Sequence, residues 1–253
     1  MAKRNKQKVV QKRWESKLEG GKIVKEKFNE ERTIPALQAK TQRQKEYLKS
    51  LNENIITVAT GHSGVGKTYC ATYRACQLLN SGLIDKIIIT RPYAHLGKDA
   101  GSVPGDDFDK YYPMVRPMLD VCKKVLGLGK YQYSIDKQII EVCPLEKIQG
   151  RSLDESCAVI ADEMQNATRP QAVSLMTRLG EEVSFLAICG DPRQAIHKNG
   201  LNTLDWTERF LSKYKINDVG IIRFTEEDCV RSGIVLEILK GLEKEGGYYT
   251  DLE

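Results

Sequence analysis

The chain has 253 residues, of which 41% are hydrophobic, and a formal net charge of +5. This length suffices for one large core with an arm, but hardly for two domains of about 200 residues each. Apolar runs are far shorter than the roughly twenty residues that cross a bilayer, and residues 1–10 contain no signal-peptide core. We therefore expect a soluble, cytoplasmic protein with no membrane partner.

Residues 1–34 read as a basic arm. Lysine and arginine are dense there, beginning with Lys3, Arg4, Lys6 and Lys8. Positive charge of this density favours binding to a polyanion, so these four side chains are candidate contacts to nucleic acid. The alternative is a solubilising tail that contacts nothing. We expect a single globular domain over residues 35–253.

Beyond the arm, apolar runs alternate with helical patterns. We expect helices at about 41–52, 67–80, 110–126, 170–179, 202–213 and 234–243. Strands are expected at about 54–60, 86–90, 138–143, 158–161, 183–189 and 219–224. Continuous apolar runs are typical of parallel strands buried on both faces, which predicts a three-layer α/β fold with helices on both faces of a parallel sheet. Because a short link follows 138–143, we expect an edge hairpin strand there.

A phosphate-binding motif follows the first strand. Every fixed position of G-x-x-x-x-G-K-[ST] is matched by Gly61-His62-Ser63-Gly64-Val65-Gly66-Lys67-Thr68. The glycines let backbone amides turn toward a triphosphate, and the helix that begins near Lys67 directs its positive dipole end at the same charge. Thr68 offers a hydroxyl to Mg²⁺, and Lys67 contacts the phosphates as a catalytic group. We expect these eight residues, with Tyr69 behind them, to bind ATP.

A pair of acids, Asp162 and Glu163, follows the fourth expected strand. An aspartate at a strand end can hold Mg²⁺ through water, and the next carboxylate can orient or deprotonate an attacking water. In open parallel sheets ligands bind beyond the carboxyl ends of the strands, where the phosphate-binding motif also lies. The pair therefore predicts hydrolysis, with Glu163 as the catalytic base and Asp162 as a metal ligand.

Two further strand ends carry candidate site residues. Gln194, after Gly190-Asp191-Pro192, can bond a phosphate oxygen or the attacking water, so it is a candidate catalytic residue. Arg91, after the second strand, is a candidate contact to nucleic acid, with a salt-bridged loop as the equal alternative. Among the aromatic residues, we assign Trp206 to packing.

The motifs together resemble the PhoH family, whose members are cytoplasmic P-loop ATPases similar to one motor core of superfamily 1 helicases. The resemblance runs from about Pro35 to Glu243. Its motifs, besides the phosphate-binding loop, are Thr41–Tyr47, Thr90-Arg91-Pro92, Val103–Asp106, Arg116-Pro117, Gly150-Arg151-Ser152, Asp162–Asn166, Thr177–Gly180 and Gly190-Asp191. It implies a RecA-like P-loop NTPase fold. It also implies that Gln44 reads the adenine edge and that Arg231 presents an arginine finger.

The favoured interpretation is an ATP-hydrolysing, helicase-like protein stimulated by single-stranded RNA or DNA. Helicase motors usually close the ATP site between two domains, and this chain has room for one. We therefore predict a homo-oligomer, with a hexameric ring as one arrangement, in which Arg231 or a neighbouring arginine enters the site of the adjacent subunit. The alternatives are a small-molecule phosphotransferase and a slow nucleotide-gated nucleic-acid-binding protein.

Overall fold

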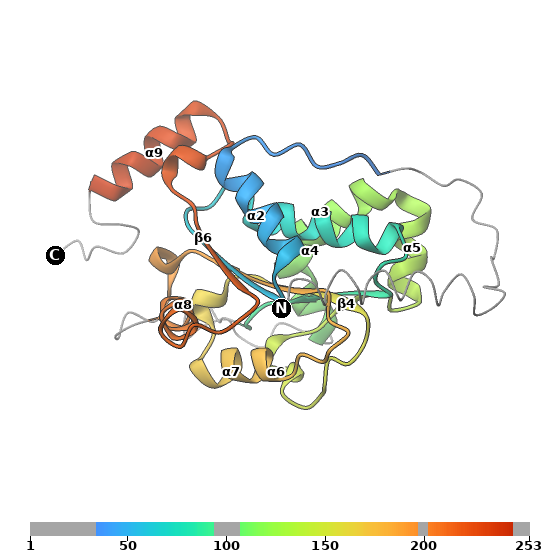
Figure 1. Ribbon diagram of the computed structural model, residues 1–253. Coiled ribbons are helices and arrows are strands. Elements are labelled where there is room, and N and C mark those ends of the chain that lie inside the picture. The colour runs from blue at the N-terminus through green and yellow to red at the C-terminus, as the bar shows by residue number, and fades with distance from the viewer. Residues whose placement is uncertain (1–33, 94–106, 197–201, 245–253) are drawn as a thin grey trace.

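The structure is a computed structural model that describes residues 34–93, 107–196 and 202–244 (Figure 1). The helices are α2 (Gln42–Glu53), α3 (Lys67–Asn80), α4 (Asp107–Leu126), α5 (Leu128–Asp136), α6 (Leu145–Ile148), α7 (Arg169–Thr177), α8 (Thr203–Lys213) and α9 (Gly233–Lys244). The strands are β1 (Ile56–Thr60), β2 (Lys86–Thr90), β3 (Ile140–Val142), β4 (Cys157–Ala161), β5 (Phe185–Gly190) and β6 (Val219–Arg223). Short 3₁₀ turns, η1 (Met164–Asn166), η2 (Pro192–Gln194) and η3 (Glu226–Asp228), follow β4, β5 and β6.

The strands form one sheet in the order β3-β2-β4-β5-β1-β6, and every pair of neighbours in it is parallel. β1 lies between β5 and β6, so that Thr60 pairs with both Gly190 and Arg223. The carboxyl ends of these strands therefore meet at one edge of the sheet. The predicted α/β fold with a parallel sheet is confirmed.

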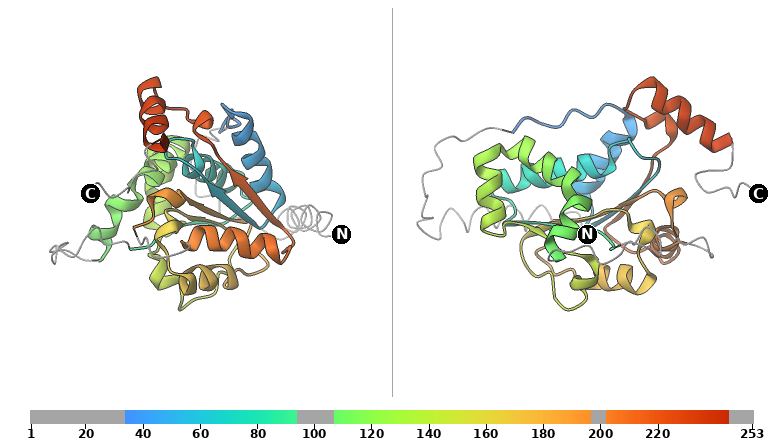
Figure 2. Two further views of the ribbon diagram at one scale, coloured as in Figure 1. Left: turned by 90° about the vertical axis from the view of Figure 1, so that its left-hand side faces the viewer. Right: turned by 180° about the vertical axis from the view of Figure 1, so that it is seen from behind.

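Helices cover the two faces of the sheet, which gives three layers (Figures 1 and 2). Alternate residues of each strand face opposite layers. On β2, Ile87 and Ile89 pack in the core under α2, α3 and α4, whereas Ile88 packs in the core over α6, α7 and α8. All three side chains are fully buried. β4 and β5, at the middle of the sheet, consist of apolar residues and one glycine because both of their faces are covered.

The strand β3 departs from the prediction. It lies at the edge of the sheet as expected, but it pairs in parallel with β2, through Ile87 and Ile140, and is not part of a hairpin. The expectation of a hairpin was wrong because β4 pairs with the other side of β2. The connection from β3 to β4 crosses β2 and is short, and it contains the single-turn helix α6. Neither α6 nor α5 was predicted.

Local sequence explains where the site-forming helices begin. Thr41 caps α2 by accepting a hydrogen bond from the backbone of Gln44, and Asn202 caps α8 in the same way through Asp205. α3 begins directly after Gly66, whose left-handed backbone turns the chain from the loop into the helix. No helix in the described part of the chain is long and apolar enough to cross a membrane.

Candidate nucleotide site

The loop between β1 and α3 folds back over the carboxyl end of β1. Gly64 and Gly66 have φ of 87° and 89°, a left-handed conformation that glycine adopts without steric cost. A Cβ at Gly66 would lie 2.9 Å from Nε2 of Gln44, so a side chain there would push aside the amide that bonds the carbonyl of Val65. The left-handed backbone thus favours glycine at both positions, and the loop keeps the shape of a phosphate cradle.

Lys67 places its ammonium group inside this loop. Its Nζ donates to the carbonyl oxygens of Gly61 and His62, at 2.6 and 2.8 Å, and the residue is 8% exposed. Burial lowers the pKa of Lys67, while the nearby Cys189 and Asp191 act in the opposite direction. The cation is therefore held at the loop by its own backbone carbonyls, in a position to meet phosphate oxygens.

Thr68 and Asp162 lie side by side next to the loop. The Thr68 hydroxyl donates to Oδ1 of Asp162 at 2.8 Å, although the two residues come from α3 and from the end of β4. Burial, followed by the charge of Glu163, raises the pKa of Asp162. A hydroxyl beside a carboxylate is the type of oxygen pair that Mg²⁺ takes in phosphate sites. The side chains present therefore fit the metal that the loop motif implies.

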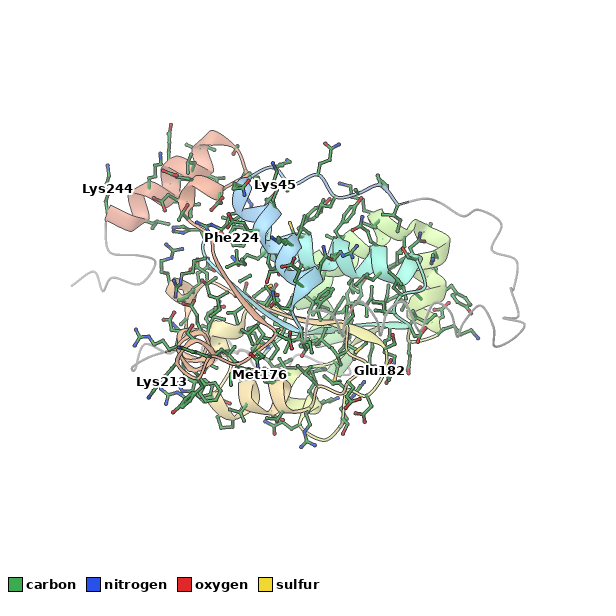
Figure 3. The ribbon with its side chains drawn as sticks, in the orientation of Figure 1. Lys45, Met176, Glu182, Lys213, Phe224 and Lys244 are labelled. Carbon is green, nitrogen blue, oxygen red and sulfur yellow. The ribbon has the colours of Figure 1, made fainter. Side chains whose placement is uncertain are left out.

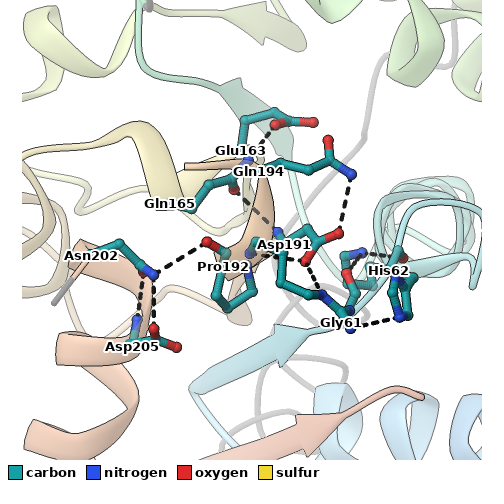
Figure 4. Close-up of polar contacts among 11 residues, drawn as sticks. Gly61, His62, Glu163, Gln165, Asp191, Pro192, Gln194, Asn202 and Asp205 are labelled. Carbon is teal, nitrogen blue, oxygen red and sulfur yellow. Dashed lines mark hydrogen bonds and ion pairs between the residues drawn. The ribbon is translucent and has the colours of Figure 1, made fainter. Parts of the chain in front are cut away.

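Glu163 is held in an unusual backbone conformation, with φ of 54° and ψ of 34°. Left-handed backbone costs a residue with a Cβ about 1–2 kcal/mol, so the surrounding contacts must maintain it. The side chain of Gln165 supplies one such contact, because its Nε2 donates to Oε2 of Glu163 at 2.6 Å. The other end of the same amide accepts from the backbone N–H of Asp191 at 3.2 Å (Figure 4). Gln165, which is 3% exposed, thus ties the end of β4 to the end of β5.

Asp191 organises the turn that carries Gln194. Its Oδ2 accepts from Nε2 of Gln194 at 3.1 Å, and its Oδ1 accepts from Nε of Arg193 at 3.0 Å. Arg193 in turn lies 2.6 Å from Nε2 of His62, a buried residue of the phosphate-binding loop (Figure 4). Gln194 is therefore fixed relative to the loop by a continuous set of polar contacts.

Gln44 packs against the loop from the α2 side. Its Nε2 donates to the carbonyl of Val65 at 2.9 Å, and its Oε1 accepts from the backbone of Lys40 at 2.8 Å. The residue is 4% exposed. These contacts hold the loop in place, and the reading of adenine by Gln44 stays a prediction. Tyr69, which is 36% exposed, lies on the first turn of α3 and faces the same cavity.

Arg231 lies on the loop of its own chain. A Cβ at Gly64 would approach Cδ of Arg231 to 2.9 Å, and the backbone of Val230 donates to the carbonyl of Gly64 at 3.2 Å. Arg231 also lines the cavity formed by the chain that carries it. The entry of Arg231, or of a neighbouring arginine, into the site of an adjacent subunit stays a prediction.

The predicted site residues converge on one cavity of about 780 Å³, within the range of small-molecule and cofactor sites. The cavity is lined by Gln44, Ser63, Gly64, Gly66, Lys67, Thr68, Tyr69, Asp162, Glu163, Gln194 and Arg231. The remaining loop residues, Gly61, His62 and Val65, complete the turn behind this wall, where His62 and Val65 are buried.

Comparison with known proteins identifies the family. The sequence model of the family described as "PhoH-like protein" matches residues 36–243 of this chain. The chain belongs to the PhoH family. Among relatives, "Protein PhoH" of Escherichia coli (strain K12) is 37% identical over 206 residues, which are 80% of this chain and 56% of that protein. The "PhoH-like protein" of Bacillus subtilis (strain 168) is 34% identical over 210 residues, 83% of this chain and 65% of that protein.

The chain spans 56% and 65% of the length of these two PhoH relatives. Among solved structures, that of Pif1 helicase from Candida albicans covers 81% of this chain and 44% of its own, with a TM-score of 0.41 and 14% identity. A likeness this remote carries no argument about activity. Family membership, the parallel sheet and the loop motif together make the chain a P-loop NTPase of the PhoH family.

The predicted contacts to nucleic acid are not among the residues that line the cavity. The Arg91 side chain donates to the carbonyl of Met114 on α4 at 3.1 Å, and its own carbonyl accepts from the Tyr111 hydroxyl at 2.8 Å. Its contact to nucleic acid stays a prediction. Lys3, Arg4, Lys6 and Lys8 lie outside the described residues.

Gln165 and Arg193 are functional residues that no sequence motif assigned to a role. Each of them holds an acid in place, Gln165 holding Glu163 and Arg193 holding Asp191. The sequence indicated this only through their spacing of two residues from these acids.

Proposed function

We propose that this PhoH-family protein binds ATP with Mg²⁺, hydrolyses it, and does so faster in the presence of single-stranded RNA or DNA. The observation that carries the proposal is the placement of Glu163. The carboxylate lies on the cavity wall beside Asp162 and is braced by Gln165, within a site that also holds the ammonium of Lys67. A phosphotransferase would need no carboxylate for an attacking water, and this favours hydrolysis.

Each side chain then has a separable task. Thr68 and Asp162 would hold the metal, which when bound bridges phosphate oxygens and neutralises their charge. Lys67 would bind phosphate oxygens from within the loop. Glu163 would orient the attacking water and accept its proton. Gln194, held by Asp191, would turn an amide group toward the same water.

The test is ATP turnover by the wild type and by Glu163→Gln, each with and without single-stranded RNA and DNA. Loss of a positioned general base lowers the rate about 10²- to 10⁴-fold, whereas ATP binding should persist because the loop is intact. Glu182→Gln is the matched control, since this exposed glutamate precedes β5, at the far end of the sheet from the cavity (Figure 3). Turnover that is indifferent to both polymers would favour the phosphotransferase or the slow nucleotide-gated switch.

We further propose that the active form is a homo-oligomer. α9 supports this because Ile234 and Ile238, one turn apart, are 62% and 55% exposed. Whether Arg231 serves its own site or that of a neighbour is decided by mixing Lys67→Ala protein with Arg231→Ala protein. Each variant alone should be inactive. Recovery on mixing would show that the arginine acts across subunits, and continued inactivity would assign it to its own chain, as its contact with Gly64 favours.

A further inference from the structure

A row of aromatic rings follows the outer face of α8. Trp206 and Phe210 stack with their ring centroids 5.2 Å apart and an interplanar angle of 19°, and Phe210 and Tyr214 follow with centroids 5.1 Å apart. The spacing of four residues places the three rings one above another along one side of the helix. We call these three residues the α8 ladder. Trp206 is not part of the buried core, so its assignment to packing does not account for this arrangement.

The α8 ladder is open to solvent along most of its length. Phe210 is 36% exposed and Tyr214 is 58% exposed, while Trp206 is half-buried. α8 lies along the lower surface of the molecule beside α7, on the face of the sheet opposite α2 and α3 (Figures 2 and 3). Exposed rings in contact with one another form a continuous apolar surface on this side of α8.

The charges around the α8 ladder are positive. The guanidinium of Arg169 lies 5.8 Å from the centre of the Trp206 ring, and Nζ of Lys213 lies 5.4 Å from that of Tyr214. The exposed charged residues of α8 are Arg209 and Lys213, and Lys215 follows.

Neither acid of α8, Asp205 or Glu208, is among its exposed residues. Glu208 is 8% exposed and forms an ion pair with Arg223. Asp205 is held by the Asn202 side chain at 2.7 Å.

We propose that the α8 ladder is a stacking surface for the bases of single-stranded nucleic acid, with the surrounding cations directed at its phosphates. Proteins that bind single strands combine a basic surface with aromatic rings on which successive bases stack. A protein partner would also use aromatic rings, but only an acidic one would match the exposed cations of α8, whereas every single strand carries phosphates. The inference deepens the proposed function, because it names where the stimulating polymer binds.

The α8 ladder is also joined to the nucleotide site. Nδ2 of Asn202, the cap of α8, donates to the carbonyl of Pro192 at 3.4 Å, in the same turn as Gln194 (Figure 4). Leu204 on the first turn packs against the backbone of Gly190. A strand bound along α8 therefore contacts an element that directly supports the turn holding Gln194.

Trp206 provides its own reporter. The chain has two tryptophans, so Trp14→Phe leaves Trp206 as the sole source of tryptophan fluorescence. We expect oligo(dT) to quench this fluorescence at saturation, and an abasic oligodeoxynucleotide of the same length to leave it unchanged, because stacking requires bases. No quenching by oligo(dT), or equal quenching by both oligonucleotides, would overturn the proposal.

Variants at the exposed end separate stacking from folding. Tyr214→Ala should weaken oligo(dT) binding roughly 5- to 150-fold, whereas Tyr214→Phe, which keeps the ring, should bind as the wild type does. Leu128→Ala is the control for loss of an exposed apolar side chain elsewhere, since Leu128 begins α5 and is 59% exposed. If Tyr214→Ala binds normally but changes the sedimentation coefficient, the surface is an interface between copies and the proposal fails.

The same variants keep this inference apart from the proposed function. Polymer-stimulated ATP turnover that survives Tyr214→Ala unchanged would overturn the role of the α8 ladder and leave the proposed ATPase intact. Base-dependent quenching without any stimulation of turnover would support the stacking surface and contradict the proposed stimulation.

Discussion

Replacing Gln165 by methionine tests how the two strand ends are held together. Methionine preserves the approximate volume of the side chain but removes both ends of the amide, which bonds Glu163 at 2.6 Å and the backbone of Asp191 at 3.2 Å. A hydrogen bond to a charged group contributes about 1.5–3 kcal/mol, here at the low end because Glu163 is partly exposed. Leaving the N–H of Asp191 buried without its acceptor costs about 1–3 kcal/mol. We expect Gln165→Met to lower the free energy of unfolding by about 2–4 kcal/mol.

Catalysis should respond separately from stability. Without its brace, Glu163 loses its fixed position, and misplacement by about 1 Å can cost up to 10²-fold in rate, so we expect kcat to fall about 10- to 100-fold. The affinity for ATP should change little, because Gln165 does not line the cavity. Urea unfolding, steady-state turnover and nucleotide titration measure the three quantities, with the exposed Gln149→Met as control. An unfolding free energy within about 0.5 kcal/mol of the wild type, with unchanged kcat, would refute the reasoning.

Further predictions concern charge and packing. Because burial and Glu163 raise the pKa of Asp162 in the folded state, its ionisation opposes folding: the wild type should lose stability relative to Asp162→Asn as pH rises from about 4 through the raised pKa. Urea unfolding of both proteins across that range checks this, and a pH-independent difference contradicts it. Gly220→Ala should cost about 1–3 kcal/mol, because the added Cβ would lie 1.9 Å from Oγ of Ser50, which bonds Thr57. Gly129→Ala, in a helix with open space around it, should be neutral or stabilising by up to about 1 kcal/mol, and equal thermal shifts for the two glycine variants would contradict the packing argument.

The layered fold could be predicted from the sequence because its strands are buried on both faces. A run such as Ile87-Ile88-Ile89 places apolar side chains on both faces of a strand, so both faces must be buried. The alternation of such runs with helical patterns therefore predicted a parallel sheet with helices on both faces. The elements that were missed carry weaker patterns. α5 combines a glycine with polar residues, and α6 has only four residues. The direction of β3 depends on pairing with β2, which no local pattern encodes.

The motifs of the site could be predicted from the sequence, but the contacts between the motifs could not. Glycines and a lysine at fixed spacing indicate a phosphate loop because few other sequences can form one. The link from His62 to Arg193 joins residues that no motif fixes, and the hydrogen bonds of Gln165 join two strands that are neighbours only in the folded sheet. The approach of Arg231 to Gly64 likewise arises because β6 pairs with β1 and returns the chain to the loop. These contacts depend on the order of the strands in the sheet, which local sequence patterns do not give.

The position of β1 also has a consequence for how the protein is made. Its residue Ile56 pairs with Leu186 on one side and with Val219 on the other, so the strand that carries the loop finds its partners only late in the chain. Pairings between such distant segments slow folding, because a long stretch must be ordered before the contact is gained. A nascent chain whose first strands had already left the ribosome would expose the edges of β1 until β6 was synthesised. The full nucleotide site, with Arg231 on its wall, is therefore completed among the last events of folding.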